Sequence, residues 1–214
     1  MFQPDFAPVI SLPQKVKHEI VIPGDDGVQA LLKASEAPLY TAILLSAVMG
    51  LRRSEICALE WSDLCGDTLY ITKAMVLSED KEWVIKTTKT VASTRAMKVP
   101  AVVLDHLDTL PREQRIVPIT SDGITYRFVS LRDKLGINMR FHDLRHTHAT
   151  MLLKQGIHPK IVQERLGHQT IGITMDTYTH VIKGMQKEAV EKMNEYLKNK
   201  KRHQKGTKEQ KDRL

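Results

Sequence analysis

Hydrophobic residues recur with a helical spacing in most segments of the chain, whereas one central stretch alternates as strands do. The run TAILLSAVMGL at 41–51 is apolar on every side, which is typical of a helix buried in a core. It is shorter than the roughly 18 apolar residues that a membrane-spanning helix requires. The spacing predicts helices at 25–34, at 39–49, from about Arg52 onward, at 101–107 and at 123–135.

Three central segments, 68–76, 81–87 and 94–100, are short, β-branched or alternating, and separated by polar turns. They predict a small antiparallel β-sheet. The expected fold class is therefore α+β, mainly α-helical with a small antiparallel sheet. Lys89 falls in the turn between the second and third strands, where a long side chain can reach into a site.

Two helices are predicted in the C-terminal half, one ending at Gly156 and one running from Pro159 to Gly167. At roughly 100° per residue, the first of them has two distinct faces. We expect one face to pack in the core and the other to be a surface available for chemistry. The first face carries Leu144, His148, Met151 and Leu152, and the second carries His142, Arg145, His146 and Ala149.

The positive charge of the chain is concentrated at its end. Residues 198–214 hold eight basic and two acidic side chains, so they carry +6 of the net +7. Any affinity of the body for nucleic acid must then come from local clusters of cations. The expected organisation is a lead-in at 1–20, one folded domain at 21–197 and a basic, disordered tail at 198–214.

Cysteine usage and the N-terminus suggest a cytoplasmic protein. Cys57 and Cys65 lie eight residues apart, without the spacing of a metal site, and are interpreted as reduced thiols. The first residues lack the charged start and apolar run of a signal peptide. A last amphipathic helix is predicted from Met185 to Leu197, where it could pack on its own core or on a neighbouring molecule.

The C-terminal half also carries a set of polar residues at distinctive spacings. His142 and Arg145 lie three apart and point the same way on a helix, which suits a grip on a phosphodiester oxygen. LGH follows at 166–168, and Tyr178 comes ten residues after its histidine. The order HxxR, LGH and Tyr resembles the C-terminal signature of tyrosine recombinases, the phage integrase family.

Two upstream segments fit the same resemblance. The family has a first arginine in a GLR–S/T–E segment, and this chain contains GLRRSEICALEW at 50–61. The family also has a lysine on a β-hairpin, and this chain contains KTTKTVASTRAMKVP at 86–100. The resemblance covers roughly residues 20–185 and implies the tyrosine recombinase catalytic-domain fold.

The resemblance implies strand cleavage and rejoining without a cofactor or a metal. Tyr178 would be the nucleophile and would form a 3′-phosphotyrosyl bond, while Arg52 and Arg145 would clamp the phosphate oxygens. Lys89 would protonate the leaving 5′-oxygen, and Lys86 is the less favoured alternative.

Two histidines complete the implied site. His142 would assist as an acid or base, and His168 would donate a hydrogen bond to the phosphate. The implied partner is double-stranded DNA at a specific attachment site, bound by a homo-tetramer that is a monomer when free. DNA-bending or directionality factors could assist, and the biology would be integration or excision of a phage or conjugative element in bacteria. Because the family usually has an upstream DNA-binding domain, we expect a fragment or a short relative with weak DNA binding.

Each residue also has a simpler interpretation. Arg52 could only pair with Glu55 on a solvated helix, Tyr178 could be a packed aromatic, and His168 could be a helix-end histidine. His148 is assigned to the core. The roles of His146 and His180 stay open, since they could support the site or lie on the surface. Arg53 and Arg165 could contact the DNA backbone, but solvated charge is the favoured interpretation.

Three other functional classes compete with the recombinase. H-x₃-H-x-H at 142–148 suggests a metal enzyme, but His146 and His148 point roughly 200° apart on a helix and no HExxH or cysteine pair supports them. A non-catalytic DNA-binding protein would not need Tyr178. A type IB topoisomerase uses similar residues, but the short LGH–Tyr spacing and small size favour the recombinase.

Overall fold

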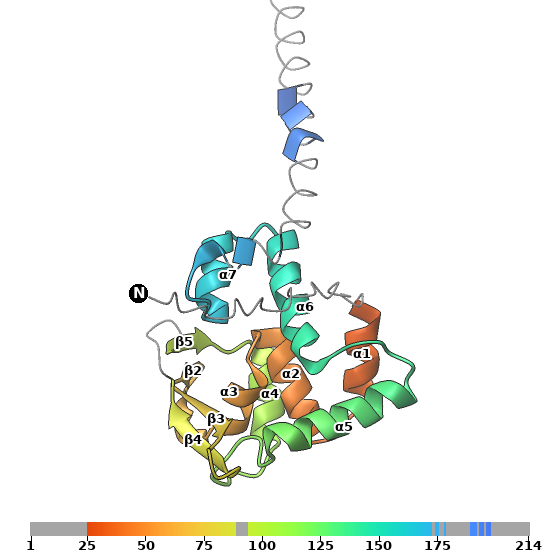
Figure 1. The fold of residues 1–214 in the computed structure, drawn as a ribbon. Helices are drawn as coiled ribbons and strands as arrows, with labels where there is room; N and C mark the ends of the chain where they lie inside the picture. The colour runs from red at the N-terminus through yellow and green to blue at the C-terminus, as the bar shows by residue number, and fades with distance from the viewer. Residues whose placement is uncertain are drawn as a thin grey trace, which may run out of the picture.

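Helix α2 (Leu39–Met49) lies at the centre of the body in the computed structural model, which describes residues 25–88, 94–172, 174–175, 178, 189–191, 193–194 and 196–197 (Figure 1). Nine of its eleven residues are buried, because it is apolar on all sides, as predicted. The chain leaves it at Gly50, whose φ is +72°. Helix α2 packs against five others: α1 (Asp25–Lys33), α3 (Arg53–Ala58), α4 (Ala101–Asp108), α5 (Ser121–Lys134) and α6 (Phe141–Lys154).

Two small antiparallel sheets lie on one side of this helical body (Figure 1). The first has the order β1 (Leu64–Cys65), β2 (Thr68–Ile71) and β5 (Arg95–Lys98), and the second pairs β3 (Lys73–Leu77) with β4 (Trp83–Thr87). The 3₁₀ helix η1 (Trp61–Asp63) precedes β1. The predicted single sheet is therefore wrong in one respect: the segment 68–76 divides at Thr72, and its two halves pair with different strands.

Helix α6 connects two separate apolar clusters. Leu144 belongs to the large core around α2, whereas Ala149 and Leu153 belong to a small cluster with α7 (Pro159–Leu166) and Tyr178. The predicted division of α6 into a core face and an open face is therefore wrong. Arg145 and Ala149 are buried by α7 and Tyr178, and Met151 is 37% exposed.

The structure describes the C-terminal helix in part. The described residues among 189–197 are helical, in agreement with the predicted last helix, and Figure 1 shows them away from the body. Their apolar side chains at Val190, Met193, Tyr196 and Leu197 are exposed. The predicted lead-in at 1–20 and tail at 198–214 lie outside the described residues. No helix in the described ranges is long and apolar enough to cross a bilayer.

Candidate active site

The guanidinium of Arg145 is buried between the two clusters and joins them. Its side chain is 2% exposed, with Nη1 donating to the Gly50 carbonyl at 2.5 Å and Nη2 to the Leu166 carbonyl at 2.5 Å. Burial and the neighbouring charge of Arg52 lower its pKa to about 9, so it remains a cation at neutral pH. Carbonyl groups at the ends of α2 and α7 therefore bind the same guanidinium.

Arg52 stands next to it, just before helix α3. Its side chain donates through Nη1 to Glu55 Oε1 at 2.6 Å and through Nη2 to the Gly167 carbonyl at 2.9 Å. The Arg52–Glu55 ion pair of the simpler interpretation is present, but Glu55 is buried and not solvated, and the same guanidinium also reaches α7. Arg52 and Arg145 bind adjacent carbonyls, and 32% of the Arg52 side chain is exposed.

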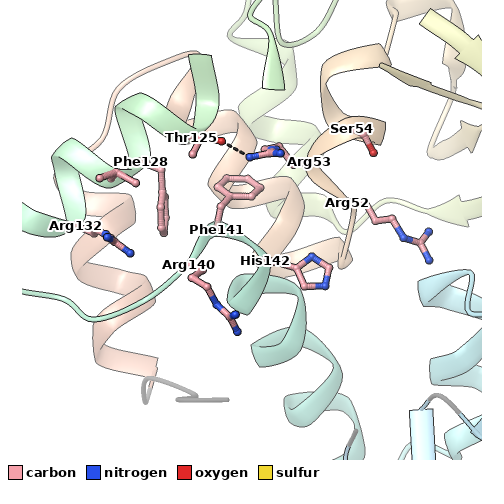
Figure 2. Close-up of a pocket in the computed structure, with 10 residues that line it drawn as sticks. Arg52, Arg53, Ser54, Thr125, Phe128, Arg132, Arg140, Phe141 and His142 are labelled. Carbon is pink, nitrogen blue, oxygen red and sulfur yellow. Dashed lines mark hydrogen bonds between the residues drawn. The ribbon is translucent and has the colours of Figure 1, made fainter. Parts of the chain in front are cut away.

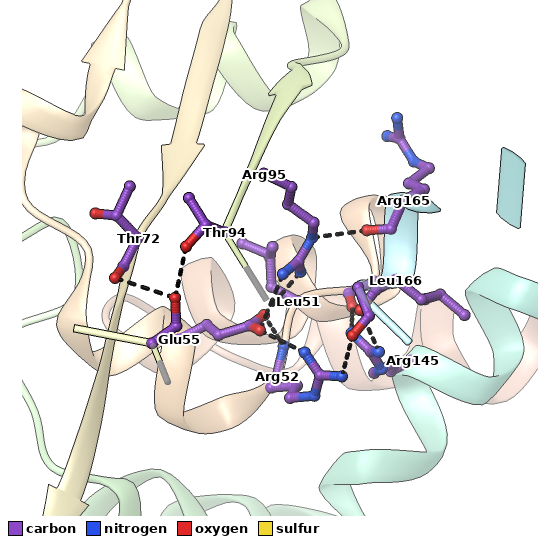
Figure 3. Close-up of polar contacts among 12 residues, drawn as sticks. Leu51, Arg52, Glu55, Thr72, Thr94, Arg95, Arg145, Arg165 and Leu166 are labelled. Atoms are coloured by element: carbon purple, nitrogen blue, oxygen red, sulfur yellow. Dashed lines mark hydrogen bonds and ion pairs between the residues drawn. The ribbon is translucent and has the colours of Figure 1, made fainter. Parts of the chain in front are cut away.

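A third arginine, Arg95, completes this network and was not identified from the sequence. It donates to both carboxylate oxygens of Glu55, at 3.0 and 2.8 Å, and its Nε donates to the Arg165 carbonyl at 2.8 Å (Figure 3). Three successive carbonyls lie at the negative end of the α7 dipole, and each accepts a hydrogen bond from a different arginine. The pairs are Arg165 with Arg95, Leu166 with Arg145, and Gly167 with Arg52. The signal available in the sequence was the STR segment at 93–95, but spacing alone does not pair it with Glu55.

The Glu55 carboxylate compensates this concentration of positive charge. Its side chain is 2% exposed. Burial alone would raise its pKa, but the hydrogen bonds and charges of Arg95 and Arg52 outweigh that effect and lower the pKa to about 2. Glu55 is therefore ionised throughout the physiological range, and it holds two cations in fixed positions.

His142 and His146 lie one turn apart on α6, as their spacing predicts. Their rings meet edge to face, with centroids 4.9 Å apart. Although the His142 side chain is exposed on one side, desolvation by its surroundings and the nearby His146 and Arg145 lower its pKa to about 4. Both histidines are therefore neutral at physiological pH, because burial also lowers the pKa of His146.

Tyr178 is the most deeply placed of the predicted site residues. It is 1% exposed and packs with Ala149, Leu153, Val162 and Leu166. Its hydroxyl lies 2.9 Å from Nδ1 of His146, whose role the sequence left open. Burial raises the pKa of the phenol well above its usual value.

His168 follows the turn that ends α7 at Gly167, whose φ is +64°. Its Nδ1 lies 2.8 Å from the Thr174 hydroxyl, and its backbone is bonded to Gln163. Burial, followed by the charges of Arg145 and Arg52, lowers its pKa to about 3. The ring is therefore a neutral donor or acceptor beside both guanidinium groups.

The structure also describes several of the other residues considered from the sequence. His148 lies in the core as predicted, and its Nε2 accepts from Arg165 Nε at 3.2 Å. Lys89 and His180 lie outside the described residues, while the alternative Lys86 is exposed on β4. Cys57 and Cys65 are both free. In the part of the chain that the structure describes, no three His, Cys, Asp or Glu side chains are placed to hold a metal ion.

A pocket of about 400 Å³ opens beside Arg52 and His142. Figure 2 shows Phe128 and Phe141 at its wall, with cationic side chains around them. These are Arg52, Arg53, Arg132 and Arg140. Arg53 is bonded to the Thr125 hydroxyl and Arg140 to Asp143, so these pocket-lining arginines are held in place by neighbouring side chains. A concave, cationic surface therefore adjoins the cluster of Arg52, Arg145, His142, His168 and Tyr178.

Residues 24–185 match the family model described as "Phage integrase family". Among curated relatives, the chain is 26% identical to a tyrosine recombinase XerC-like protein of Caldanaerobacter subterraneus, over 85% of this chain and 56% of the relative. It is 28% identical to the ICEBs1 integrase of Bacillus subtilis, over 74% of this chain and 48% of that protein. The chain thus spans about half the length of these relatives.

Solved structures show the same fold. The Tn1549 transposon integrase in complex with transposon right end DNA superposes with a TM-score of 0.67 at 19% identity, over 82% of this chain and 68% of that one. The XerA recombinase superposes with a TM-score of 0.61 at 20% identity, over 84% and 66% of the two chains. The predicted catalytic-domain fold, mainly helical with small antiparallel sheets, is therefore confirmed.

Proposed function

Because the chain belongs to the phage integrase family, we propose that it cleaves and rejoins DNA as a tyrosine-type site-specific recombinase. The reaction would be a transesterification that passes through a 3′-phosphotyrosyl intermediate and needs no cofactor. Relatives named as tyrosine recombinases, a phage integrase and the ICEBs1 integrase support this activity. They also support a role in integration or excision of a phage or conjugative element.

One observation carries the proposal: two guanidinium groups and the candidate nucleophile meet around the end of α7. Arg52 and Arg145 bind the carbonyls of Gly167 and Leu166. Tyr178 packs against Leu166 and is hydrogen-bonded to His146, the residue after Arg145. A non-catalytic DNA-binding protein has no need for a phenol that faces His146 beside the cation of Arg145.

In this mechanism the phosphate binds where the arginines now contact the α7 carbonyls. The exposed part of Arg52 is the accessible half of the clamp, so the scissile phosphate would take over its Gly167 contact. Arg145 lies behind it and supplies a fixed positive charge. Charge placed in advance at a dry site stabilises the pentacovalent phosphorane without reorganisation.

The remaining groups serve proton transfer and orientation. Tyr178 attacks phosphorus, and Lys89 protonates the departing 5′-oxygen. His168 hydrogen-bonds a non-bridging oxygen, as its neutral ring beside both arginines permits. His142, exposed at the pocket wall, assists as an acid or base.

The buried state of Tyr178 implies that DNA binding must open the small cluster. At 1% exposure the phenol cannot reach a phosphate in solution. We place the DNA backbone next to Arg52 along the pocket lined by Arg53, Arg132 and Arg140, whose fixed cations suit phosphates. Occupation of this pocket and of Arg52 would loosen the Gly167 turn and uncover the Tyr178 hydroxyl, while the phenol keeps its contact with His146 on α6.

The expected assembly is a homo-tetramer on double-stranded DNA at a specific attachment site, because recombination exchanges four strands. A lambda integrase tetramer bound to a Holliday junction shares the fold, with a TM-score of 0.53 over 72% of this chain and 47% of that one. We propose a monomer for the free chain, with the catalytic domain at 21–197, acting on DNA in the bacterial cytoplasm. Accessory factors that bend DNA or set direction would complete the reaction.

The test is covalent trapping. The 214-residue chain is incubated with a pool of nicked duplexes whose central sequence is randomised, with excess chelator present. Covalent adducts are resolved on a denaturing gel and their DNA is sequenced. We expect an adduct with the wild-type chain and with Tyr126→Phe, the matched control, because Tyr126 is 79% exposed on α5. Tyr178→Phe should bind DNA and form no adduct.

Two results would contradict the proposal. One is the absence of an adduct from the wild-type chain while the DNA is bound. The other is an adduct that persists in Tyr178→Phe. An adduct that forms only when the chelator is left out would instead support a metal enzyme.

A further inference from the structure

The hydroxyl of Tyr178 has a specific hydrogen-bond partner that neither the sequence motif nor the phosphate clamp explains. His146 Nδ1 lies 2.9 Å from it, and the two ring centroids are 5.9 Å apart. Within the described residues, this is the one hydrogen bond recorded for the hydroxyl. Among the described side chains, which otherwise enclose it with apolar groups, the hydroxyl therefore faces the basic nitrogen of His146.

Attack by a phenol on phosphorus requires its proton to leave. The phenol is the neutral form at physiological pH, and the apolar neighbours of Tyr178 disfavour the phenolate further. A proton acceptor in contact with the oxygen removes this obstacle, since the proton can move as the new bond forms. Of the other groups near the phosphate, the arginines are cations, His168 is assigned to a non-bridging oxygen, and His142 lies on the pocket side.

The surroundings of His146 keep its ring available as an acceptor. Burial is the largest effect on its pKa and lowers it, the charge of Asp143 opposes this, and Arg145 and Arg140 act with burial. The ring is therefore neutral at pH 7. In the tautomer that carries its proton on Nε2, Nδ1 accepts from the hydroxyl. After transfer, the nearby Asp143 carboxylate offsets the new charge of the imidazolium.

We propose that His146 is a catalytic residue that accepts the phenolic proton of Tyr178 during strand cleavage. The inference rests on the proposed function and assigns a group that the family signature at His142, Arg145, His168 and Tyr178 does not include. As the Tyr178 Oη–P bond forms and the P–O5′ bond breaks, the phenolic proton moves to Nδ1. The 5′-oxygen takes its proton from a separate donor, so charge and atoms balance.

The reverse step follows from the same geometry. When a 5′-hydroxyl attacks the phosphotyrosine, the imidazolium of His146 returns its proton to the departing Tyr178 oxygen. This assignment also separates the role of His142 from that of His146 on α6. His142 lies on the pocket side, whereas His146 is the ring that touches the nucleophile.

The competing explanation is that His146 only holds Tyr178 in position. Asparagine distinguishes the two roles, because its amide oxygen can replace Nδ1 as a hydrogen-bond acceptor but cannot take the proton. A fluorinated tyrosine at 178 provides a second distinction. Fluorine substitution makes the phenol more acidic, so its attack depends less on a base.

The experiment measures single-turnover adduct formation at saturating protein, on the nicked duplex recovered from the randomised pool. We expect His146→Ala and His146→Asn each to slow cleavage by about a hundredfold or more, the usual contribution of general base catalysis. With fluorotyrosine at 178, the loss in both variants should shrink below about tenfold. His158→Asn is the matched control, since His158 is exposed at the start of α7 and asparagine keeps an acceptor for the Lys160 amide, and it should cleave as the wild type does. Circular dichroism and DNA binding confirm that each variant is folded.

The outcomes are distinct. Wild-type rates in His146→Asn with slow cleavage in His146→Ala would reduce His146 to a positioning residue and overturn the inference. Unchanged or faster cleavage in both variants would overturn it as well, as would a loss that fluorotyrosine does not relieve. In all these cases the wild-type adduct leaves the proposed function intact, whereas its absence would remove both.

Discussion

The body around α2 and the small unit formed by α7 and Tyr178 are held together by different forces. The body has a large continuous apolar core, to which every helix from α1 to α6 contributes. The small cluster has five buried members: Ala149, Leu153, Val162, Leu166 and Tyr178. It is fixed to the body mainly by α6 and by hydrogen bonds from Arg52, Arg95 and Arg145 to the last carbonyls of α7.

The contacts that stabilise the body are therefore different from the contacts that would respond to substrate. Apolar contacts do not respond to DNA, whereas a phosphate competes directly for guanidinium donors. The unit that carries the candidate nucleophile is thus attached through groups that the substrate itself would recruit. Elements that move during function are drawn from the less stable parts of a protein.

The largest effect should come from neutralising Glu55. Glu55→Gln leaves Arg95 and Arg52 without their shared counter-charge in a buried site, and we expect a loss of about 3–5 kcal/mol in the free energy of unfolding. Asp108→Asn is the control, because its ion pair with Arg112 is more than half exposed and should contribute less than about 1 kcal/mol. Urea denaturation measures both. Equal losses in the two variants would show that the network does not join the units.

Truncating one leucine in each unit compares their packing directly. Leu45 and Leu153 are both 0% exposed. Leu45→Ala should cost about 3–4 kcal/mol and act on the whole chain. Leu153→Ala should lower the free energy of global unfolding by less, because the small cluster can open by itself. It should also accelerate hydrogen exchange at residues 157–172. Uniform exchange acceleration across α2 and α7 in both variants would contradict the division.

Gly50 tests the contact between the two units. A Cβ at this position would lie 2.7 Å from the His148 ring and 2.9 Å from Leu166, and its φ is +72°. Gly50→Ala should cost about 2–3 kcal/mol, of which about 1 comes from the left-handed backbone. Gly66→Ala shares that backbone cost at φ +58° but meets no atom within 4 Å. Chemical denaturation of Gly50→Ala and Gly66→Ala measures the two losses in free energy of unfolding, and their difference is the cost of the Cβ contacts at Gly50. Identical losses would show that these contacts cost nothing.

Mild acid should weaken the region between the units through its histidines. Burial lowers the pKa of His148 to about 4, and the unfolded chain binds that proton near pH 6.5. Below pH 6.5 protons therefore favour the unfolded state, and stability falls as the pH drops toward 4. Between pH 7 and pH 5, His148 alone should account for about 2 kcal/mol. Thermal or urea unfolding measured from pH 7 to pH 5 gives the dependence of the free energy of unfolding on pH. His148→Gln should reduce this dependence by the His148 contribution, and an unchanged dependence would contradict the prediction.

The sequence predicted much of the fold because its signals are local. Helix α2 is apolar on all sides, and Gly50 and Gly167 end their helices in left-handed conformations, so their positions follow from neighbouring residues. The division of the strands at Thr72 did not follow, because pairing partners are chosen across the fold. Likewise the faces of α6 were misassigned, since a helix that packs in two cores has no open side.

For the site, the chain order of Arg52, His142, Arg145, His168 and Tyr178 identified the candidates, although their roles remain predictions. It could not reveal Arg95 beside Glu55, nor His146 beside Tyr178, because those contacts span 40 and 32 residues. Spacing along one helix fixes which side chains share a face, but not what packs against that face.

By itself, then, the sequence determined the helices, the family and the residue types needed to handle a phosphate, since these depend on local periodicity and motif. Only the tertiary structure decided that three arginines share the end of α7, that the phenol is enclosed, and that a histidine faces it. Those arrangements depend on long-range packing, where burial and charge act between segments that are distant in the chain.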